Sequence, residues 1–146
     1  MTKIAGTVSV NLNTAELKLG GQRYARAVVS ELAEAVQKQA QHNVAPGVGP
    51  GPHPHKVYPG WPENVDTGDL MRSVKAELVE DTETRAEAAV YTPLEYGADL
   101  ELGWIHPVSG THWRYPWLFP AGLVALRQFN HVAKRLYHVL AGKLAK

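Results

Sequence analysis

The sequence contains no cysteine, which excludes disulfide frameworks, cysteine-ligated metal sites and cysteine nucleophiles. The absence of cysteine also fits assembly in a reducing cytoplasm. No apolar run approaches the roughly 18–20 residues that cross a bilayer, and the first residues lack the apolar core of a signal peptide. We therefore expect no membrane partner. Neither charge sign is in excess, since the chain has 15 Lys and Arg and 14 Asp and Glu. This balance excludes a grossly basic nucleic-acid coat.

Recognisable catalytic motifs are also missing. The chain has no GxSxG nucleophile elbow, no P-loop and no GxGxxG. The glycines at 47–51 alternate with prolines, which lack the amide hydrogens of a phosphate cradle. We therefore expect a protein that is not an enzyme and holds no cofactor. Its 146 residues, 45% of them hydrophobic, suit a single domain over 1–146.

The balanced total charge hides three segments of different sign. Residues 1–62 carry six basic and three acidic residues, 63–101 carry three basic and eleven acidic ones, and 102–146 carry six basic and none acidic. Two solvated faces of opposite sign would explain this pattern. Self-complementary stacking of subunits would explain it equally well, and the sequence leaves both interpretations open.

Hydrophobic periodicity predicts an α+β fold, an antiparallel sheet of hairpins packed against two long helices. Helical spacing predicts one long helix over 22–43 and a second that begins near Pro120. The second helix should bury a stripe that includes Leu123, Leu126 and Val139. Alternating side chains predict a strand over 4–12 and a hairpin of two strands over 74–91, with its turn at 81–84. A short helix should follow Asp66, which can act as its N-cap.

A Pro/Gly-rich segment separates the first helix from the rest of the chain. Residues 46–66 hold six of the ten prolines, so we treat 46–65 as a loop insertion that is neither helix nor central strand. Such a long connection has little capacity for a core of its own. We expect 46–62 to be ordered by a neighbouring subunit or partner, with Tyr58 and Trp61 as anchors.

Residues 99–117 predict a second, aromatic hairpin that projects from the body. A turn at 107–110 places Trp104 opposite Trp113 and puts six large apolar side chains on one face. Tyrosine and tryptophan are common at interface hot spots, so we expect this face to contact other subunits. Ordinary intramolecular core is the alternative. The six residues are Leu100, Leu102, Trp104, Trp113, Tyr115 and Trp117.

Two other classes of site can be weighed against a structural role. Histidines 53, 55, 106 and 112 lie in or beside predicted loops, but their spacing matches no HExxH or zinc-finger pattern. Two groups of carboxylates, Asp66 with Asp69 and Glu95 with Asp99 and Glu101, could suggest acid–base chemistry, but no nucleophile with a base partner lies beside them. The basic last helix suggests a small nucleic-acid-binding module, although its basic residues are sparse for a DNA reader.

Three short segments resemble a family of phage proteins. Residues 66–74 resemble its D-T-G-x-L-x-x-S-I/V signature, 91–97 are similar to its Y-x-x-x-x-E-F/Y-G segment with one spacer residue fewer, and 115–121 are similar to its R-P-F-L-x-P-A segment. This is the lambdoid tail-completion family, also described as minor capsid or head–tail connector proteins of long-tailed bacteriophages. The matching residues are Asp66, Thr67, Gly68, Leu70, Ser73, Tyr91, Glu95, Tyr96, Gly97, Pro116, Phe119 and Pro120.

The resemblance implies a structural virion protein that forms a ring at the phage neck and joins the DNA-filled head to the tail. The symmetry of long-tailed phages makes six subunits the favoured number and twelve the alternative. The implied partners are a head-side connector and a tail-side terminator or tube protein, with genome DNA passing through the ring. The implied localisation is the virion neck, after assembly in the host bacterial cytoplasm. As scaffold residues, Asp66 would cap a helix and Gly97 would take a left-handed turn.

Overall fold

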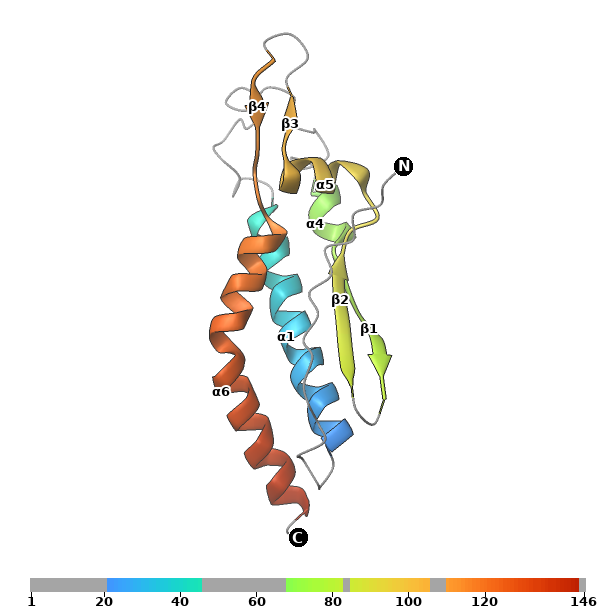
Figure 1. Cartoon of the computed structure of the whole chain (residues 1–146), viewed down its shortest axis with the longest axis vertical. Coiled ribbons are helices and arrows are strands. Elements are labelled where there is room, and N and C mark those ends of the chain that lie inside the picture. Colours follow the sequence, from blue (N-terminus) through green and yellow to red (C-terminus); the bar gives the residue numbers. More distant parts are fainter. Residues whose placement is uncertain (1–20, 46–67, 83–84, 106–109, 145–146) are drawn as a thin grey trace.

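The computed structural model describes residues 21–45, 68–82, 85–105 and 110–144. Two long helices, α1 (Gly21–Asn43) and α6 (Leu118–Leu144), lie side by side (Figure 1). Between them in sequence come two short helices and two small antiparallel sheets, in the order α4 (Asp69–Ser73), β1 (Lys75–Asp81), β2 (Ala86–Tyr91), α5 (Glu95–Leu102), β3 (Trp104–Ile105) and β4 (His112–Trp113). The α+β class predicted from the sequence is confirmed.

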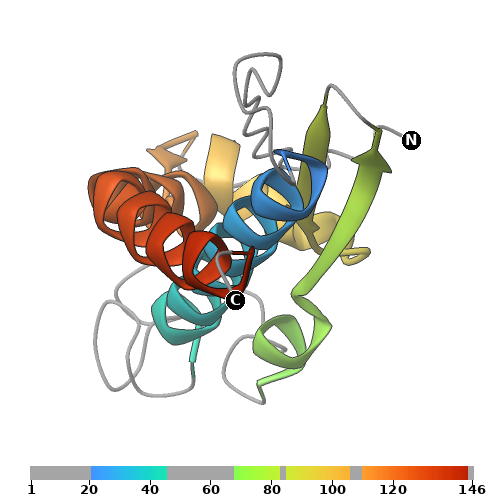
Figure 2. The ribbon, with the colours of Figure 1, turned by 90° about the horizontal axis from the view of Figure 1, so that it is seen from below.

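The body of the molecule has three layers, with α1 between α6 and the hairpin β1–β2 (Figures 1 and 2). Helix α1 is therefore apolar toward both neighbours. Val28 and Leu32 pack with Val132 of α6, whereas Val29 and Val36 belong to the main core, which also includes Ala88 of β2. The sequence predicted two helices that cover one sheet, but only α1 contacts the hairpin extensively.

The hairpin β1–β2 has the predicted position and turn. Alanine and valine side chains of β2 face α1, and small residues there let the helix approach closely. A register shift between Leu78 and Glu80 leaves Val79 as the extra residue of a β-bulge.

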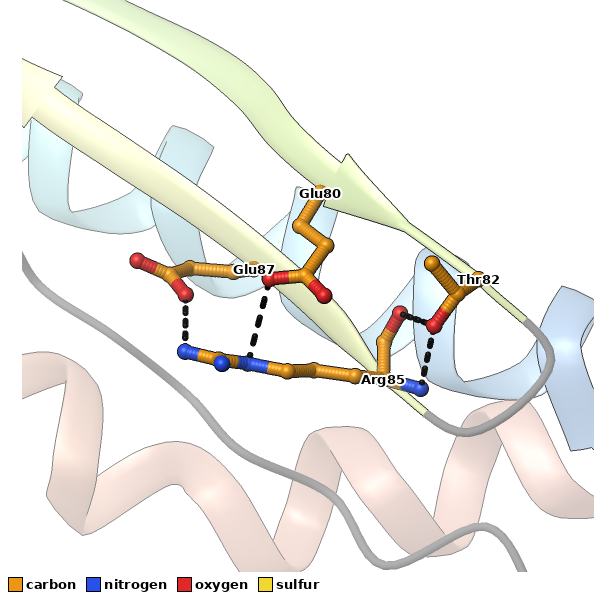
Figure 3. Close-up of polar contacts among 4 residues, drawn as sticks. All are labelled: Glu80, Thr82, Arg85 and Glu87. Carbon is orange, nitrogen blue, oxygen red and sulfur yellow. Dashed lines mark hydrogen bonds and ion pairs between the residues drawn. The ribbon is translucent and has the colours of Figure 1, made fainter.

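The tip of this hairpin is held by polar contacts on the sheet face away from α1 (Figure 3). The amide of Thr82 donates to the carbonyl oxygen of Arg85 over 2.8 Å, and the amide of Arg85 donates to Thr82 Oγ1 over 3.1 Å. Glu80 and Glu87 lie opposite each other, an arrangement that is repulsive on its own. The guanidinium of Arg85 forms ion pairs with both carboxylates and offsets this repulsion.

The second hairpin is much shorter than predicted. Strands β3 and β4 pair Trp104 with Trp113 and Ile105 with His112, and they extend beyond α5 at one end of the molecule (Figure 1). The predicted strand over 99–102 is wrong, because residues 95–102 form helix α5. Leu100 and Trp117 therefore do not share a strand face with the hairpin. Both are buried in the core of the chain itself.

Helix α6 begins two residues before Pro120, which occupies its first turn as predicted. The predicted buried stripe is partly wrong, because Leu123, Leu126 and Val139 are exposed and the buried positions include Ala121, Ala125 and Val132. Among the described helices, none is long and apolar enough to cross a membrane. Several predictions fall on residues outside the described part of the chain. They are the strand over 4–12, the insertion over 46–65 with Tyr58 and Trp61, the motif residues Asp66 and Thr67, and histidines 53, 55 and 106, which were weighed as metal ligands.

Candidate functional site

Residues of the three motif segments meet around the end of α1 that leads to Asn43. Leu70 of α4, Gly97 of α5 and Trp117 just before α6 all lie buried there. The indole nitrogen of Trp117 donates a hydrogen bond to the carbonyl oxygen of Gly97 over 2.8 Å. We call this cluster of Leu70, Ser73, Thr92, Gly97 and Trp117 the junction.

Gly97 is required at the junction because there is no room for a side chain. A Cβ atom on Gly97 would lie 2.6 Å from Thr92 Cγ2 and 3.2 Å from Leu70 Cδ1. Gly97 lies inside helix α5 and is absent from the described residues with positive φ, so the expected left-handed turn is wrong. Among the described glycines, φ is positive at Gly68, the left-handed N-cap of α4 (83°), at Gly103 after α5 (106°) and at Gly110 (67°).

Two hydroxyl groups connect α4 to the start of α5. Ser73 Oγ donates to the carbonyl oxygen of Leu70 over 2.7 Å and lies 2.6 Å from Thr92 Oγ1. A serine hydroxyl has one hydrogen, so Thr92 must donate in the contact between the two. Thr92 Oγ1 also accepts the amide of Leu94 over 3.1 Å. These bonds fix the side chain of Thr92 and prevent it from moving away from Gly97.

The carboxylate of Glu101 caps helix α6. Its Oε2 accepts the amides of Trp117 over 2.7 Å and Leu118 over 2.8 Å, and its Oε1 accepts the amide of Phe119 over 3.0 Å. The first amides of a helix have no partner within the helix, and a negative charge at this end is favourable. Sequence reasoning considered Glu101 only as a possible acid–base group, because a cap from another helix leaves no local signal.

The same end of α1 is attached to α6 and to the segment before it. Asn43 Nδ2 donates to the carbonyl oxygen of Trp117 over 2.9 Å, and the hydroxyl of Tyr115 donates to the carbonyl oxygen of Asn43 over 3.2 Å. Gln37 donates to the carbonyl oxygen of Val74 over 3.0 Å, which attaches α1 to the end of α4. These bonds attach α1 to α4 and α6, and the Glu101 cap attaches α5 to α6.

The other residues that the sequence predicted as motif or interface positions differ in how far they are exposed. Tyr91, Tyr96, Tyr115, Pro116 and Pro120 are half-buried, whereas Glu95, Leu102 and Phe119 are exposed. The backbones of Trp104 and Trp113 are paired in the projecting hairpin. Thus Leu70, Ser73, Gly97 and Trp117 are brought together, and the exposed residues point elsewhere.

The polar contacts around the junction are of the kind that stabilises a fold. The described residues contain no group of three or more His, Cys, Asp or Glu side chains that could hold a metal ion. Burial raises the pKa of Tyr24, with a further contribution from Tyr137, and the Tyr24 hydroxyl donates to the carbonyl oxygen of Ala133. The contacts of Ser73 with Thr92 and of Trp117 with Gly97 join different segments of the fold at the junction.

A family model matches residues 11–103, well over half of the chain, and its description is "Bacteriophage HK97-gp10, putative tail-component". The chain belongs to this HK97-gp10-like family. Its membership makes it a structural phage protein, a tail component of the virion. No curated protein and no solved structure gives a significant match.

The family match spans most of the junction and stops before α6. Residues Leu70, Ser73, Thr92, Gly97 and Glu101 lie within the matched range, whereas Trp117 lies beyond it. The HK97-gp10-like segment therefore includes the carboxylate that caps α6 and the glycine that accepts the indole hydrogen bond.

We expect Glu101→Gln to lower the free energy of unfolding by about 1–2 kcal/mol, because it removes the charge and one of the two acceptor oxygens at the start of α6. Urea denaturation followed by circular dichroism measures this change. Asp99→Asn is the matched control, since it makes the same substitution at an exposed carboxylate on the same helix. Equal effects of the two substitutions would contradict the capping role.

Proposed function

We propose that this tail component forms a ring of subunits at the phage neck, where it joins the DNA-filled head to the tail. The ring has six subunits, or twelve if it follows the symmetry of the portal. In this proposal residues 1–146 act as one connector domain that contacts a head-side connector and a tail-side terminator or tube protein.

Family membership and one structural observation support a connector. Hydrogen bonds at and beside the junction connect α1, α4, α5 and α6, while large apolar side chains remain exposed on elements around it. Leu102, Ile105 and Phe119 are each more than half exposed, and they lie at the end of α5, in β3 and at the start of α6. Exposed apolar side chains gathered in one part of a surface are typical of interaction sites. Exposed apolar groups on a fixed scaffold are typical of a protein that is completed by its neighbours. No comparable observation favours the alternative of a nucleic-acid-binding module.

The test is the phenotype of phage that lack the gene for this protein. We expect DNA-filled heads and separate tails that join when purified protein is added, and electron microscopy of complete virions should show a ring at the neck. Normal virions without the protein would overturn the proposal, as would a ring elsewhere in the tail.

Trp104→Ala should abolish the joining of heads to tails and leave the subunit folded, because Trp104 lies in the projecting hairpin β3–β4. We propose that Leu102, Trp104, Trp113 and Tyr115 contact a neighbouring subunit, together with Tyr58 and Trp61. Leu100 and Trp117 are removed from this set because they are buried within the chain.

Joining of heads to tails is measured with the variant protein, and thermal unfolding is measured on the same preparation. A loss of about 3–5 kcal/mol in stability would show instead that Trp104 belongs to the subunit's own core.

A further inference from the structure

Strand β2 is buried in the manner of a central strand. Four of its six residues are buried, whereas none of the seven residues of β1 is. Because neighbouring side chains of a strand alternate, Ala88 faces α1 and Ala89 faces the other way, and both are buried. The described residues nevertheless pair β2 with β1 alone.

The backbone edge of β2 that points away from β1 needs hydrogen-bond partners. In an antiparallel pair, about half of the N–H and C=O groups of each strand point away from the other strand. Buried backbone groups are almost always paired. A strand as buried as β2 therefore fits a sheet in which another strand lies along its second edge.

Strand β1, in contrast, has the features of an outer edge. It is mostly exposed, four of its seven residues are charged, and a bulge lies at Val79. Charged side chains and bulges on an edge strand hinder the pairing of further strands. An additional strand therefore belongs on β2 and not on β1.

An apolar seam lies beside the second edge of β2, where β2, α1 and α6 meet. Within the hairpin, β2 is the strand nearer α6 (Figures 1 and 2). The cavity in the seam measures only about 10 Å³, which is roughly the room that one water molecule needs. The seam is therefore a shallow surface that suits a covering strand, and it has no room for a small-molecule ligand. Its lining includes Val29 and Ala33 of α1, Ala88 of β2, and Gly122, Ala125 and Leu126 of α6.

The segment that the sequence predicts as a strand over 4–12 matches this place in its pattern. Every second residue from Ile4 is apolar or glycine, and the residues between them are small or polar. We propose that residues 4–12 pair with the second edge of β2 in the same subunit, in the antiparallel direction. Val8, Val10 and Leu12 then lie on the apolar seam, and Ser9 lies on the outer face of the sheet.

The start of α1 determines the direction of this pairing. Arg26 of α1 forms an ion pair over 2.7 Å with Asp81, the last residue of β1, so α1 begins near the turn of the hairpin. Strand β2 also begins at this turn and runs away from it. A strand joined to α1 by residues 13–20 alone runs toward the turn, antiparallel to β2. Nine residues in a strand span about 30 Å, which is enough to follow the whole of β2.

The added strand changes the relation between the sheet and the helices. With residues 4–12 in place, the sheet has three strands, and α6 covers its new margin while α1 covers the hairpin. This is the arrangement of two helices on one sheet face that the sequence predicted. The family match begins at residue 11, so most of the strand lies outside it. The docking is also independent of the proposed neck ring, because it occurs within one subunit.

Nuclear magnetic resonance of the purified full-length protein tests the pairing directly. Facing residues of antiparallel strands have Cα atoms about 4.5 Å apart at their closest pairs, which gives nuclear Overhauser effects between their Hα atoms. We expect such contacts between residues 4–12 and Ala86–Tyr91. Contacts of 4–12 with β1 instead, or with neither strand, would overturn the proposal.

A mixed sample shows which copy supplies the strand. Isotope-labelled and unlabelled protein are unfolded together and refolded, and the spectra are filtered for contacts between a labelled and an unlabelled chain. We expect the contacts between 4–12 and β2 to be absent from the filtered spectra, since both strands belong to one chain. Their presence there would show that a second copy donates the strand, and it would refute docking within the subunit.

A pair of matched substitutions tests which face of the strand meets the seam. Val10→Asp places a charge against the apolar lining, and we expect it to speed the hydrogen exchange of the β2 amides about tenfold or more. Ser9→Asp places the same charge on the neighbouring residue, which faces outward, and should change this exchange by less than about twofold. Equal acceleration by the two substitutions, or none by either, would contradict the proposed docking.

Discussion

Replacing Trp117 with alanine should lower the free energy of unfolding by about 3–5 kcal/mol, the usual cost of truncating a fully buried large aromatic side chain. Trp117 is only 1% exposed, and it is the largest fully buried side chain among the described residues. The substitution would also leave the carbonyl oxygen of Gly97 without its indole donor. Urea denaturation of the purified subunit, followed by circular dichroism, measures the loss.

Trp117→Phe separates the hydrogen bond from the packing. Phenylalanine keeps much of the apolar volume but has no N–H group, so we expect a loss of about 1–3 kcal/mol from the unpaired carbonyl oxygen and the smaller ring. A phenylalanine variant as stable as the parent would show that the bond to Gly97 contributes little. An alanine variant with nearly unchanged stability would refute the place of Trp117 in the core.

Gly97→Ala is the second substitution with a large expected effect. The added methyl group would lie 2.6 Å from Thr92 Cγ2, well inside contact distance. Thr92 cannot turn away without breaking its hydrogen bonds to Ser73 and Leu94. Overpacking of this kind costs about 1–3 kcal/mol, and we expect the upper part of that range in the same denaturation assay.

The clash can be relieved by a second substitution. Thr92→Ser removes the Cγ2 methyl group and keeps the hydroxyl that bonds Ser73. The double variant Gly97→Ala, Thr92→Ser should therefore be more stable than the sum of the two single effects, by about 1 kcal/mol or more. Strict additivity would show that the cost of Gly97→Ala arises from something other than the contact with Thr92.

The long elements could be predicted because their patterns are long. Helix α1 repeats its apolar spacing over 23 residues, and the small alternating side chains of β2 fit a half-buried strand. Helix α5 has only eight residues, and the i, i+2 spacing of Leu100 and Leu102 in that window follows the alternation of a strand. The preference for helix comes from tertiary contacts, in which Gly97 and Leu100 face the core and Glu101 reaches α6.

The junction was only partly visible in the sequence. Its motif residues were identified by resemblance, but the reasons for Gly97 and Glu101 depend on atoms that come from distant parts of the chain. The exposed stripe on α6 shows a related limit. Apolar periodicity predicts that Leu123 and Leu126 are covered, but it does not say whether the cover is this chain or another one.

Helix α1 ends, and α4 packs, within the same part of the fold, joined by the bond from Gln37 to the carbonyl oxygen of Val74. The connection between them therefore starts and finishes at fixed points, and its length affects the stability of the subunit through the entropy of closing a loop. That entropy grows with the logarithm of length, so doubling the connection costs about 0.6 kcal/mol. This position can accept segments of different length at little cost in stability, so the insertion predicted over 46–65 would be compatible with the same core.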